Sequence, residues 1–242
     1  MSAAELEALL ALQDVDTRID QEKHRRATLA ERAELSDVEE VIAQKLAQKS
    51  SLVSQRDEVA ARQAEAESEL QATEARMAQV HSKLYSGQVT ATRELQAMAA
   101  DEELLRKRVS ELEDRALMFM EERGPLDAQV ASLDAELAEL QTRRAGAARA
   151  LQAAEREVDT VLAELEGQRA GAKAAVPPKL LATYERLRDR LGGVAVARLV
   201  GGRCDGCHLS LPSMELDRIR HQAPGSLVFC EQCGRILVAE GS

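Results

Sequence analysis

Aromatic residues are scarce in this chain. Its 242 residues include no tryptophan, two tyrosines and two phenylalanines. Because aromatic side chains bury large areas in globular cores, their scarcity argues against a large globular core. Charged residues make up 31% of the chain and hydrophobic residues 45%, which is the composition of long amphipathic helices and coiled coils. We therefore predict an extended, mainly α-helical fold.

Long apolar segments are also missing. Nowhere do eighteen apolar residues follow one another, and the first segment, MSAAELEALLALQDVD, lacks the basic start and apolar centre of a signal peptide. These absences predict a cytoplasmic protein that does not enter a membrane. In a reducing cytosol, the four cysteines are more typical of metal ligands than of disulfides.

The sequence shows no catalytic signature. It contains no recognisable nucleophile with its base and orienting acid, no phosphate-binding loop and no paired-carboxylate motif, so we predict that the chain is not an enzyme. The net charge is −10, but the segment from Pro178 onward carries nine basic and seven acidic residues. The acidic body does not suit binding of nucleic acid along its whole length, whereas the basic tail alone is able to contact phosphates.

A seven-residue repeat runs through the second half of the helical region. From Leu95 to Leu165 apolar residues recur at alternating steps of three and four, and only Glu102, Arg123 and Arg144 interrupt them. Such a repeat buries one narrow stripe against another helix and predicts a coiled coil. The first half repeats less regularly.

The stretch SKLYSGQVTATRELQAM breaks the helical composition at residues 82–98. Gly87 can adopt the positive φ of a tight reversal, and the β-branched residues after it disfavour helix. Helices from about Ala4 to Leu84 and from about Arg93 to Gly167 would each be about 110 to 120 Å long. A turn near 85–92 would fold one along the other in a long antiparallel coiled-coil hairpin, and hence in a monomer or weak homodimer.

The alternative is one continuous helix in a parallel dimer, because the repeat stays in phase across the turn. Three further features bear on helix continuity. Ser36 with Glu39 resembles a capping box, Pro125 predicts a kink, and glycines and prolines between Gly167 and Pro178 predict a linker. We therefore divide the chain into a hairpin at residues 1–175 and a C-terminal domain at 176–242, with separate cores.

Two C-x-x-C pairs occur in the C-terminal domain. They comprise Cys204 with Cys207 and Cys230 with Cys233. Each pair forms a tight turn whose two sulfurs converge, so together they suit one tetrahedral Zn²⁺. Four thiolates leave no position for a reactive water, which predicts a structural zinc. A redox dithiol is the alternative, but it needs only one pair.

The neighbouring segments predict a small α+β zinc ribbon. Lys179–Arg190 reads as a helix and Val194–Val200 as a strand, while LVF and RILV flank the second pair as a hairpin. Gly206 and Gly234 fit the two turns. A helix from Ser213 would pack Met214, Leu216 and Ile219 on the ribbon.

Four arginines lie near the cysteines in the sequence and are expected to form a basic rim on the ribbon, namely Arg203, Arg218, Arg220 and Arg235. These side chains are candidates for contact with a partner, either an acidic protein surface or the phosphates of RNA or DNA. Tyr85 and Arg93 are the corresponding candidates at the hairpin turn. His208 and His221 are expected at the surface rather than at the metal.

The chain resembles a bacterial family that joins an N-terminal coiled-coil hairpin to a C-terminal C4-type zinc ribbon. The segments LLALQDVDTRID, KLYSGQVTATRELQAM, ARLVGGRCDGCHLSLPSMELDRI and CEQCGRIL carry this resemblance across nearly the whole chain. The family usually has Asn-Pro where this chain has Ala91-Thr92, so Thr90 or Thr92 is expected to cap the second helix.

The resemblance implies a non-enzymatic adaptor, scaffold or chaperone-like protein. Some family members look like binders of the alternative sigma factor of the nitrogen-regulation type, of flagellin message or of type III secretion components. We therefore expect one structural zinc and a protein partner that docks on the ribbon and the hairpin. The alternative is a regulatory protein that binds nucleic acid through the basic rim.

Overall fold

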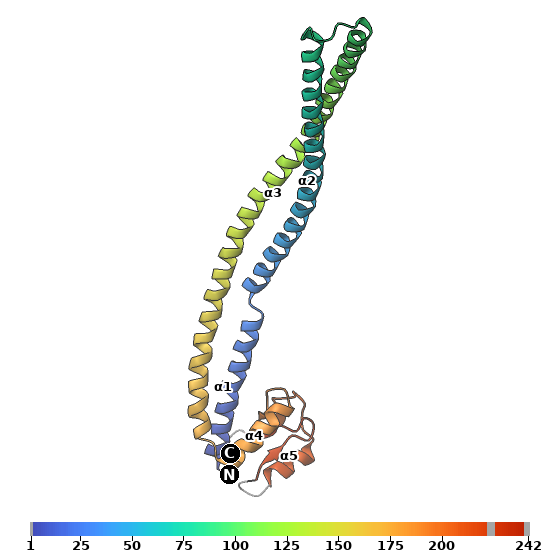
Figure 1. Cartoon of the computed structure of the whole chain (residues 1–242). Coiled ribbons are helices and arrows are strands. Elements are labelled where there is room, and N and C mark those ends of the chain that lie inside the picture. The colour runs from blue at the N-terminus through green and yellow to red at the C-terminus, as the bar shows by residue number, and fades with distance from the viewer. Residues whose placement is uncertain (1, 222–225, 240–242) are drawn as a thin grey trace. The chain divides into compact units, whose positions relative to one another are not determined.

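The computed structural model describes residues 2–221 and 226–239. Three long helices come first, and a small region of helices and short strands follows them (Figure 1). The elements in chain order are α1 (Ala3–Ala27), α2 (Ala30–Tyr85), α3 (Thr92–Ala174), α4 (Pro178–Arg190), β1 (Val196–Val200), β2 (Arg203–Cys204), α5 (Ser213–Arg220), β3 (Val228–Phe229) and β4 (Ile236–Ala239). None of the described helices is both long and apolar enough to cross a membrane.

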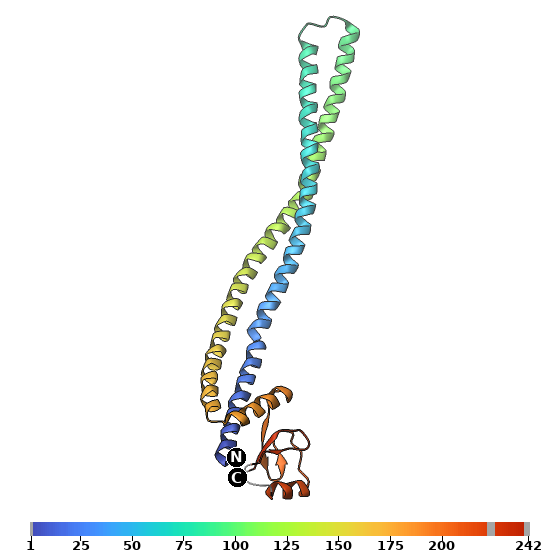
Figure 2. The same cartoon turned by 60° about the horizontal axis from the view of Figure 1, so that its bottom comes forward.

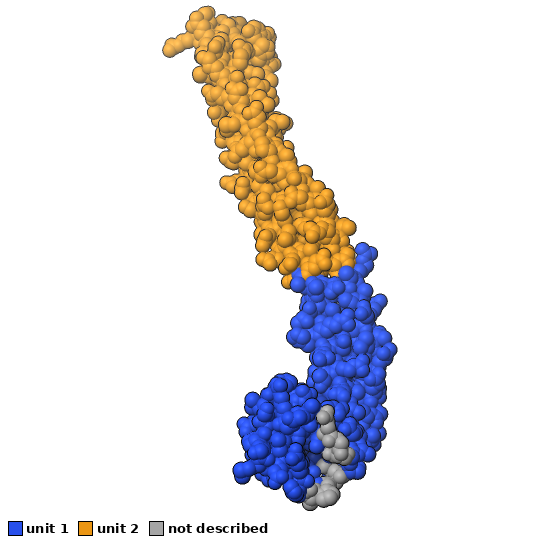
Figure 3. Space-filling view, turned by 180° about the vertical axis from the view of Figure 1, so that it is seen from behind, with its two compact units in different colours: residues 1–33, 148–242 blue, residues 34–147 orange. Residues whose placement is uncertain are grey.

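The chain forms two compact units, coloured separately in Figure 3. We call Glu34–Ala147 the hairpin unit, and Met1–Ala33 together with Ala148–Ser242 the terminal unit. Helix α3 contributes to both units, because its first part belongs to the hairpin unit and its last part to the terminal unit.

The hairpin unit consists of α2 and the first part of α3, which run side by side in opposite directions (Figures 1 and 2). Helix α2 ends at Tyr85 and α3 begins at Thr92, as the turn motif predicts. Gly87 adopts a φ of 74° in the turn, a conformation that costs glycine little. The predicted antiparallel hairpin is confirmed, and the alternative of one continuous helix is wrong.

The predicted apolar stripe forms the buried seam. Every buried residue of α3, which the structure describes throughout, lies on that stripe, and Leu112 and Val158 are fully buried. Phe119 packs with Val59 and Ala66 of α2. The seam therefore follows the seven-residue repeat because that spacing keeps one helix face turned toward its partner.

Two expectations about helix breaks are wrong. The helix predicted from Ala4 to Leu84 is interrupted between α1 and α2, where Thr28 ends α1. The Thr28 hydroxyl donates to the carbonyl oxygen of His24 at 2.9 Å, a local bond of the kind that competes with continued helix. Ser36 and Glu39, the predicted capping box, lie inside α2 and do not mark the start of a helix.

Helix α3 continues through Pro125 and through two glycines that were expected to end it. Pro125 lies within the helix, so it does not impose a loop. The helix also continues past Gly167 and Gly171 to Ala174, because helix-disfavouring glycines are tolerated where packing supports the helix. The linker is thus limited to the residues just before Pro178.

The terminal unit contains a four-stranded sheet in the order β2-β1-β4-β3. Strands β1 and β4 are parallel, with Val196 opposite Ile236, and the other two pairings are antiparallel. The β3–β4 pair is the predicted hairpin around the second cysteine pair. The fold is therefore mainly α, with a long antiparallel coiled-coil hairpin and a small α+β region.

One hydrophobic core joins both ends of the chain. Leu9 and Leu12 of α1 are fully buried, together with Tyr184 of α4 and Ile236 of β4. This cluster corrects the expectation of separate cores, because α1 packs with the sheet and α4 as well as with α3. A second cluster lies around the cysteines and includes Leu211.

Candidate metal centre

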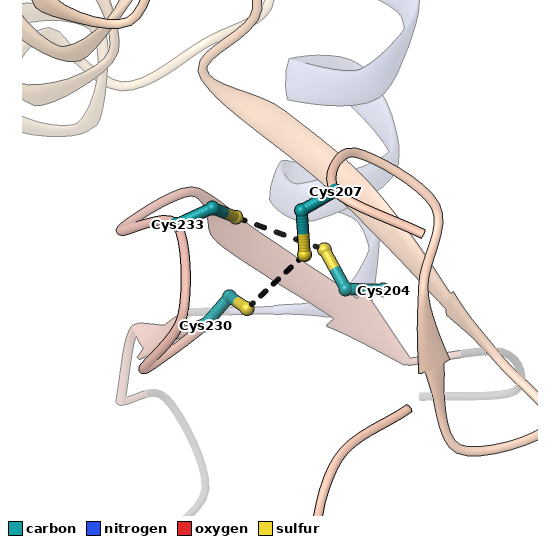
Figure 4. Close-up of side chains that lie close together, drawn as sticks. All are labelled: Cys204, Cys207, Cys230 and Cys233. Atoms are coloured by element: carbon teal, nitrogen blue, oxygen red, sulfur yellow. Dashed lines mark hydrogen bonds between the residues drawn. The ribbon is translucent and has the colours of Figure 1, made fainter. Parts of the chain in front are cut away.

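The four cysteines lie in two tight turns of the terminal unit. Cys204 ends β2 and Cys230 follows β3, and both are buried, whereas Cys207 and Cys233 are half-buried. Figure 4 shows the four sulfur atoms gathered together. The Sγ–Sγ distance is 3.9 Å both from Cys204 to Cys233 and from Cys207 to Cys230, and all four ligand atoms lie within 4.8 Å of one another.

The two turns have the same backbone hydrogen bonds. The N–H of His208 donates to the carbonyl of Cys204 at an N···O distance of 2.8 Å, and Gly234 donates to Cys230 in the same way, also at 2.8 Å. Each of these first cysteines donates its own N–H to the carbonyl five residues later, at 3.0 and 2.9 Å. Because the two turns have the same geometry and face each other, the two thiols of each turn converge on one point.

Gly234 and Gly206 serve these turns for different reasons. Gly234 has a φ of 74°, and the equivalent residue in the first turn is His208, with a φ of 60°. The left-handed conformation is costly for a residue with a Cβ atom. Gly206 instead provides space, since a Cβ there would lie 2.5 Å from Cδ of Arg235 and 2.9 Å from Cβ of Ala197.

The sulfur spacing fits one tetrahedral zinc ion. Zinc–thiolate bonds of about 2.3 Å place the sulfurs of a tetrahedron about 3.8 Å apart, close to the observed separation of 3.9 Å. The described histidines lie outside this cluster, and the side chains of His208 and His221 are 66% and 77% exposed. The centre is a Cys₄ site for one structural Zn²⁺, as predicted.

The free thiols differ in their tendency to ionise. Burial raises the pKa of Cys204 to about 12 and also raises the pKa of Cys230. Burial opposes ionisation of Cys233 as well, but hydrogen bonds involving Arg235, Cys230 and Cys207 outweigh it and lower its pKa to about 7. Of these three thiols, Cys233 therefore most readily becomes a thiolate, the form that binds zinc.

Two family models match the chain. Residues 12–192 match the CT398-like coiled coil hairpin domain, and residues 203–237 match the C4-type zinc ribbon domain. The chain belongs to the CT398-like family. The resemblance found in the sequence motifs is thereby confirmed, and the second match covers all four cysteines.

Relatives of this CT398-like protein include an uncharacterised Mycobacterium tuberculosis protein, Rv2229c. It is 30% identical over 235 residues, which span 97% of this chain and 95% of the relative. A solved structure from Mycobacterium smegmatis matches with a TM-score of 0.90 at 26% identity, covering 99% of both chains. CT398 from Chlamydia trachomatis matches with a TM-score of 0.76 at 20% identity, covering 98% of both chains, and shares the fold.

The predicted partner arginines of this CT398-like chain are engaged to different degrees. Arg203 and Arg235 donate from Nε to the backbone carbonyls of His208 and Val194, at 2.8 and 3.0 Å. Arg218 of α5 forms an ion pair with Glu231. Arg220, also on α5, is exposed and has no ion pair within the described residues. The four side chains therefore do not form a uniformly free rim.

The turn residues are accessible. Tyr85 is 72% exposed, and its ring lies 4.6 Å, centroid to centroid, from that of His81. Arg93, in the first turn of α3, is exposed as well. The carbonyl of Ala91 accepts the first helical hydrogen bonds of α3, so the expectation that Thr90 or Thr92 caps this helix is wrong.

Helix α5 shows what the ribbon prediction missed. Leu216 and Ile219 pack on the cysteine cluster as expected, but Met214 is 84% exposed. Glu215 is buried in its place and accepts a hydrogen bond from the backbone N–H of Glu231 at 3.3 Å. The sequence did contain one indication of this burial, because Glu215 precedes the buried-face residue Ile219 by four positions. The burial was missed because charged residues are rarely buried.

Two buried polar residues of α1 were also missed, although both lie in the LLALQDVDTRID motif. Gln13 accepts hydrogen bonds at Oε1 from the N–H groups of Ala195 and Val196, at 2.7 and 3.3 Å, and donates from Nε2 to the carbonyl of Gly193 at 2.9 Å. These bonds join α1 to the start of β1. They explain why a polar residue stands among the buried leucines.

Asp16 is the centre of a second buried polar contact. It is 1% exposed and accepts hydrogen bonds from Nε of Arg169 at 2.5 Å and from the hydroxyl of Tyr184 at 2.6 Å. Burial, followed by the hydrogen bond to Asp16, raises the pKa of Tyr184. The hydrogen bond to Asp16 likewise raises the pKa of Arg169. Asp16 therefore joins α1, α3 and α4 through charged and neutral donors.

Proposed function

We propose that the chain is a non-enzymatic cytoplasmic adaptor whose zinc ribbon docks a protein partner. The observation that carries this proposal is the exposure of large apolar side chains on so small a region. Leu209 is 51% exposed, Met214 84% and Phe229 41%. Exposed apolar residues on a metal-stabilised module suit contact with another protein, since methionine and aromatic side chains are enriched in protein interfaces.

The metal centre supports a structural rather than a catalytic role for the ribbon. All four positions of a tetrahedral zinc are supplied by cysteine thiolates, so no position is left at which the metal could activate water. The zinc instead holds two turns and the strands between them. It thereby fixes the backbone next to Leu209 and Phe229, each of which lies beside one cysteine turn.

The arginine contacts favour a protein partner over nucleic acid. Phosphate binding depends on cationic donors that can reach the ligand. Arg218 is neutralised by Glu231, and Arg203 and Arg235 are each held to the ribbon by a hydrogen bond from Nε to a backbone carbonyl. Arg220 is the arginine best placed to contribute a contact at the edge of an apolar interface. Tyr85 and Arg93 offer a second contact at the hairpin turn.

An affinity capture from the native cytosol tests this proposal. The bait is the zinc-loaded full chain, and capture is compared at about 0.1 and 0.5 M salt. The apolar variant combines Leu209→Gln with Met214→Gln, and the matched basic variant combines Arg203→Gln with Arg220→Gln. We expect the apolar variant to weaken capture at least tenfold, or about 1.4 kcal/mol, with zinc content unchanged.

Three outcomes separate the candidate surfaces. Salt-resistant capture of a protein that only the apolar variant loses supports docking through the ribbon. Capture of RNA or DNA that falls steeply with salt and is lost in the basic variant would instead establish the nucleic-acid alternative. Loss of capture only in a Tyr85→Ala, Arg93→Ala variant would place the working surface at the hairpin turn.

A further inference from the structure

The terminal unit contains a charged cavity away from the metal centre. Its volume is about 490 Å³, and it lies among residues of α1, α3 and α4. Four basic side chains line it together with two acidic ones, namely Lys23, Arg169, Lys173, Arg188, Asp16 and Glu166. Pockets for small molecules typically span about 300 to 1,000 Å³, so the cavity is large enough for a small ligand.

Asp16 holds the two arginines in place. Its carboxylate oxygens lie 2.5 Å from Nε of Arg169 and 3.5 Å from Nε of Arg188. Asp20 accepts hydrogen bonds from Nη2 of Arg188 at 2.6 and 2.7 Å. Both guanidinium groups thus face the same carboxylate, and their fixed positions leave them preorganised for another anion.

Two donors of the cavity have no acceptor among the described residues. Nε of Arg188 is buried without a hydrogen-bond partner, because its separation from Asp16 exceeds ordinary hydrogen-bond length. Lys23 lines the cavity and forms no ion pair within the part of the chain that the structure describes. A buried donor without a partner is costly, and an oxygen-rich ligand would supply the acceptor.

We infer that this cavity binds a small molecule carrying a phosphate or a comparable oxyanion group. Arginine binds such groups through several N–H donors, and lysine adds a charge. Arg169, Arg188 and Lys173 are already paired with Asp16, Asp20 and Glu185. An oxyanion would therefore add contacts to Nε of Arg188 and to Lys23 rather than replace these pairs. This binding site is independent of the proposed adaptor surface.

Glu166 and Lys23 should have opposite effects on the affinity for an anion, which allows the inference to be tested. It lines the cavity and forms no ion pair among the described residues, so its charge opposes an anionic ligand. Removing this charge is expected to strengthen binding, whereas removing the charge of Lys23 is expected to weaken it. Both side chains belong to exposed residues, so neither substitution removes a buried contact.

Calorimetric titration of the zinc-loaded full chain with inorganic pyrophosphate measures these effects. We expect one site per chain with a Kd below about 1 mM. Lys23→Gln should weaken binding about fivefold and Glu166→Gln strengthen it about fivefold, the effect of one partly screened charge. Lys179→Gln is the matched control, because Lys179 is exposed on α4 but does not line the cavity.

The inference is overturned if the unmodified chain shows no binding below about 1 mM. It is also overturned if Lys179→Gln weakens binding as much as Lys23→Gln, because the attraction would then be spread over the surface. Zinc content is measured after each titration, so that any heat from metal removal by pyrophosphate is recognised. Opposite shifts for Lys23→Gln and Glu166→Gln, with no shift for the control, support the assigned cavity.

Discussion

The hairpin unit and the terminal unit are stabilised in different ways. In the hairpin unit, burial follows a regular repeat, and charged pairs such as Lys49 with Asp134 lie at the edge of the seam with both side chains partly exposed. In the terminal unit, Asp16 and Gln13 are buried and bind groups more than 150 residues away in sequence. Stability is thus spread over many similar contacts in one unit and depends on a few particular contacts in the other.

The two units should therefore respond differently to substitution. A repeated seam tolerates the loss of an exposed ion pair, since such pairs contribute about 0.2 to 1 kcal/mol. A buried polar residue that satisfies several donors cannot be removed without leaving those donors unpaired. The predictions below test this contrast, beginning with the largest expected effect.

Replacement of a zinc ligand should affect the terminal unit alone. We expect Cys230→Ser to lose zinc, whose binding to structural sites contributes about 10 to 16 kcal/mol. Because β4 shares a core with α1 and α4, amides of α4 should exchange with solvent much faster, whereas amides of the hairpin unit keep their protection. Metal analysis and hydrogen exchange measure both effects, and stoichiometric zinc in a Cys207→Ser, Cys230→Ser variant would refute the site.

Acid should have the next largest effect, again on the terminal unit. Zinc binds thiolates, so the bound cysteines have pKa values below their unfolded value of about 8.5. The stability that zinc provides is therefore present near neutral pH and is lost as pH falls. Below pH 7 even Cys233, with its pKa of about 7 as a free thiol, must release a proton to bind.

We expect zinc affinity to fall by several orders of magnitude from about pH 7 to pH 5. Competition with a zinc-binding dye at each pH measures this change. The helical signal of the hairpin unit should persist after zinc release, because that unit contains none of the ligands. An affinity that stays constant over this range would contradict thiolate ligation.

Asp16→Ala should destabilise the terminal unit by about 3 to 5 kcal/mol, since it leaves Arg169 without its buried counterion and the hydroxyl of Tyr184 without its acceptor. Asp134→Ala in the hairpin unit is the matched control, because it removes a carboxylate from an exposed ion pair with Lys49. That control should cost less than about 1 kcal/mol. Native-state hydrogen exchange in α4 and in α2 measures the loss of stability in each unit. Equal losses for the two variants would refute the contrast between the units.

A better N-cap at the start of α3 should stabilise the hairpin unit. Ala91 occupies the N-cap position but has no side-chain acceptor, so Ala91→Asn combined with Thr92→Pro should stabilise the hairpin unit by about 1 kcal/mol. Ala99→Asn, within the helix, should instead destabilise it by about 0.7 kcal/mol. Thermal unfolding followed by circular dichroism compares them, and a destabilised double variant would show that Ala91 is not the cap.

The first cysteine turn should gain stability from a glycine. His208 has a φ of 60°, so His208→Gly should stabilise the ribbon by about 0.5 to 1 kcal/mol after allowing for the entropy of glycine. The reciprocal change Gly234→His should destabilise the second turn by about 1 to 2 kcal/mol. The rate at which a chelator removes zinc measures the effect of each variant. If His208→Gly and Gly234→His changed this rate in the same direction, the two turns would not be equivalent.

Local and repeated features were predictable from the sequence. The seam, the reversal at Gly87 and the convergence of the four cysteines each depend on spacings within a short segment or on a pattern that many residues repeat. The break at Thr28 was not predictable in this way, since no glycine or proline marks it. A single threonine has only a weak preference against helix.

The shared core was beyond sequence reasoning for a different reason. Nothing in the spacing of Gln13 and Asp16 indicates a partner near residue 169 or 195, and polar residues within a helix ordinarily face solvent. The burial of Glu215 was not predicted for the same reason. Buried polar residues are satisfied by specific groups that only the folded chain brings near, so single-sequence patterns do not reveal them.

The contact between Gln13 and Ala195 also sets the order in which the chain can finish folding. The two residues are 182 positions apart, and a ribosome that adds about 5 to 20 residues per second makes the second about 10 to 40 s after the first. During that interval Leu9, Leu10 and Leu12 have been synthesised, but β1 and β4 have not. A newly made α1 therefore carries an apolar stripe that is fully covered only after β4 has left the ribosome.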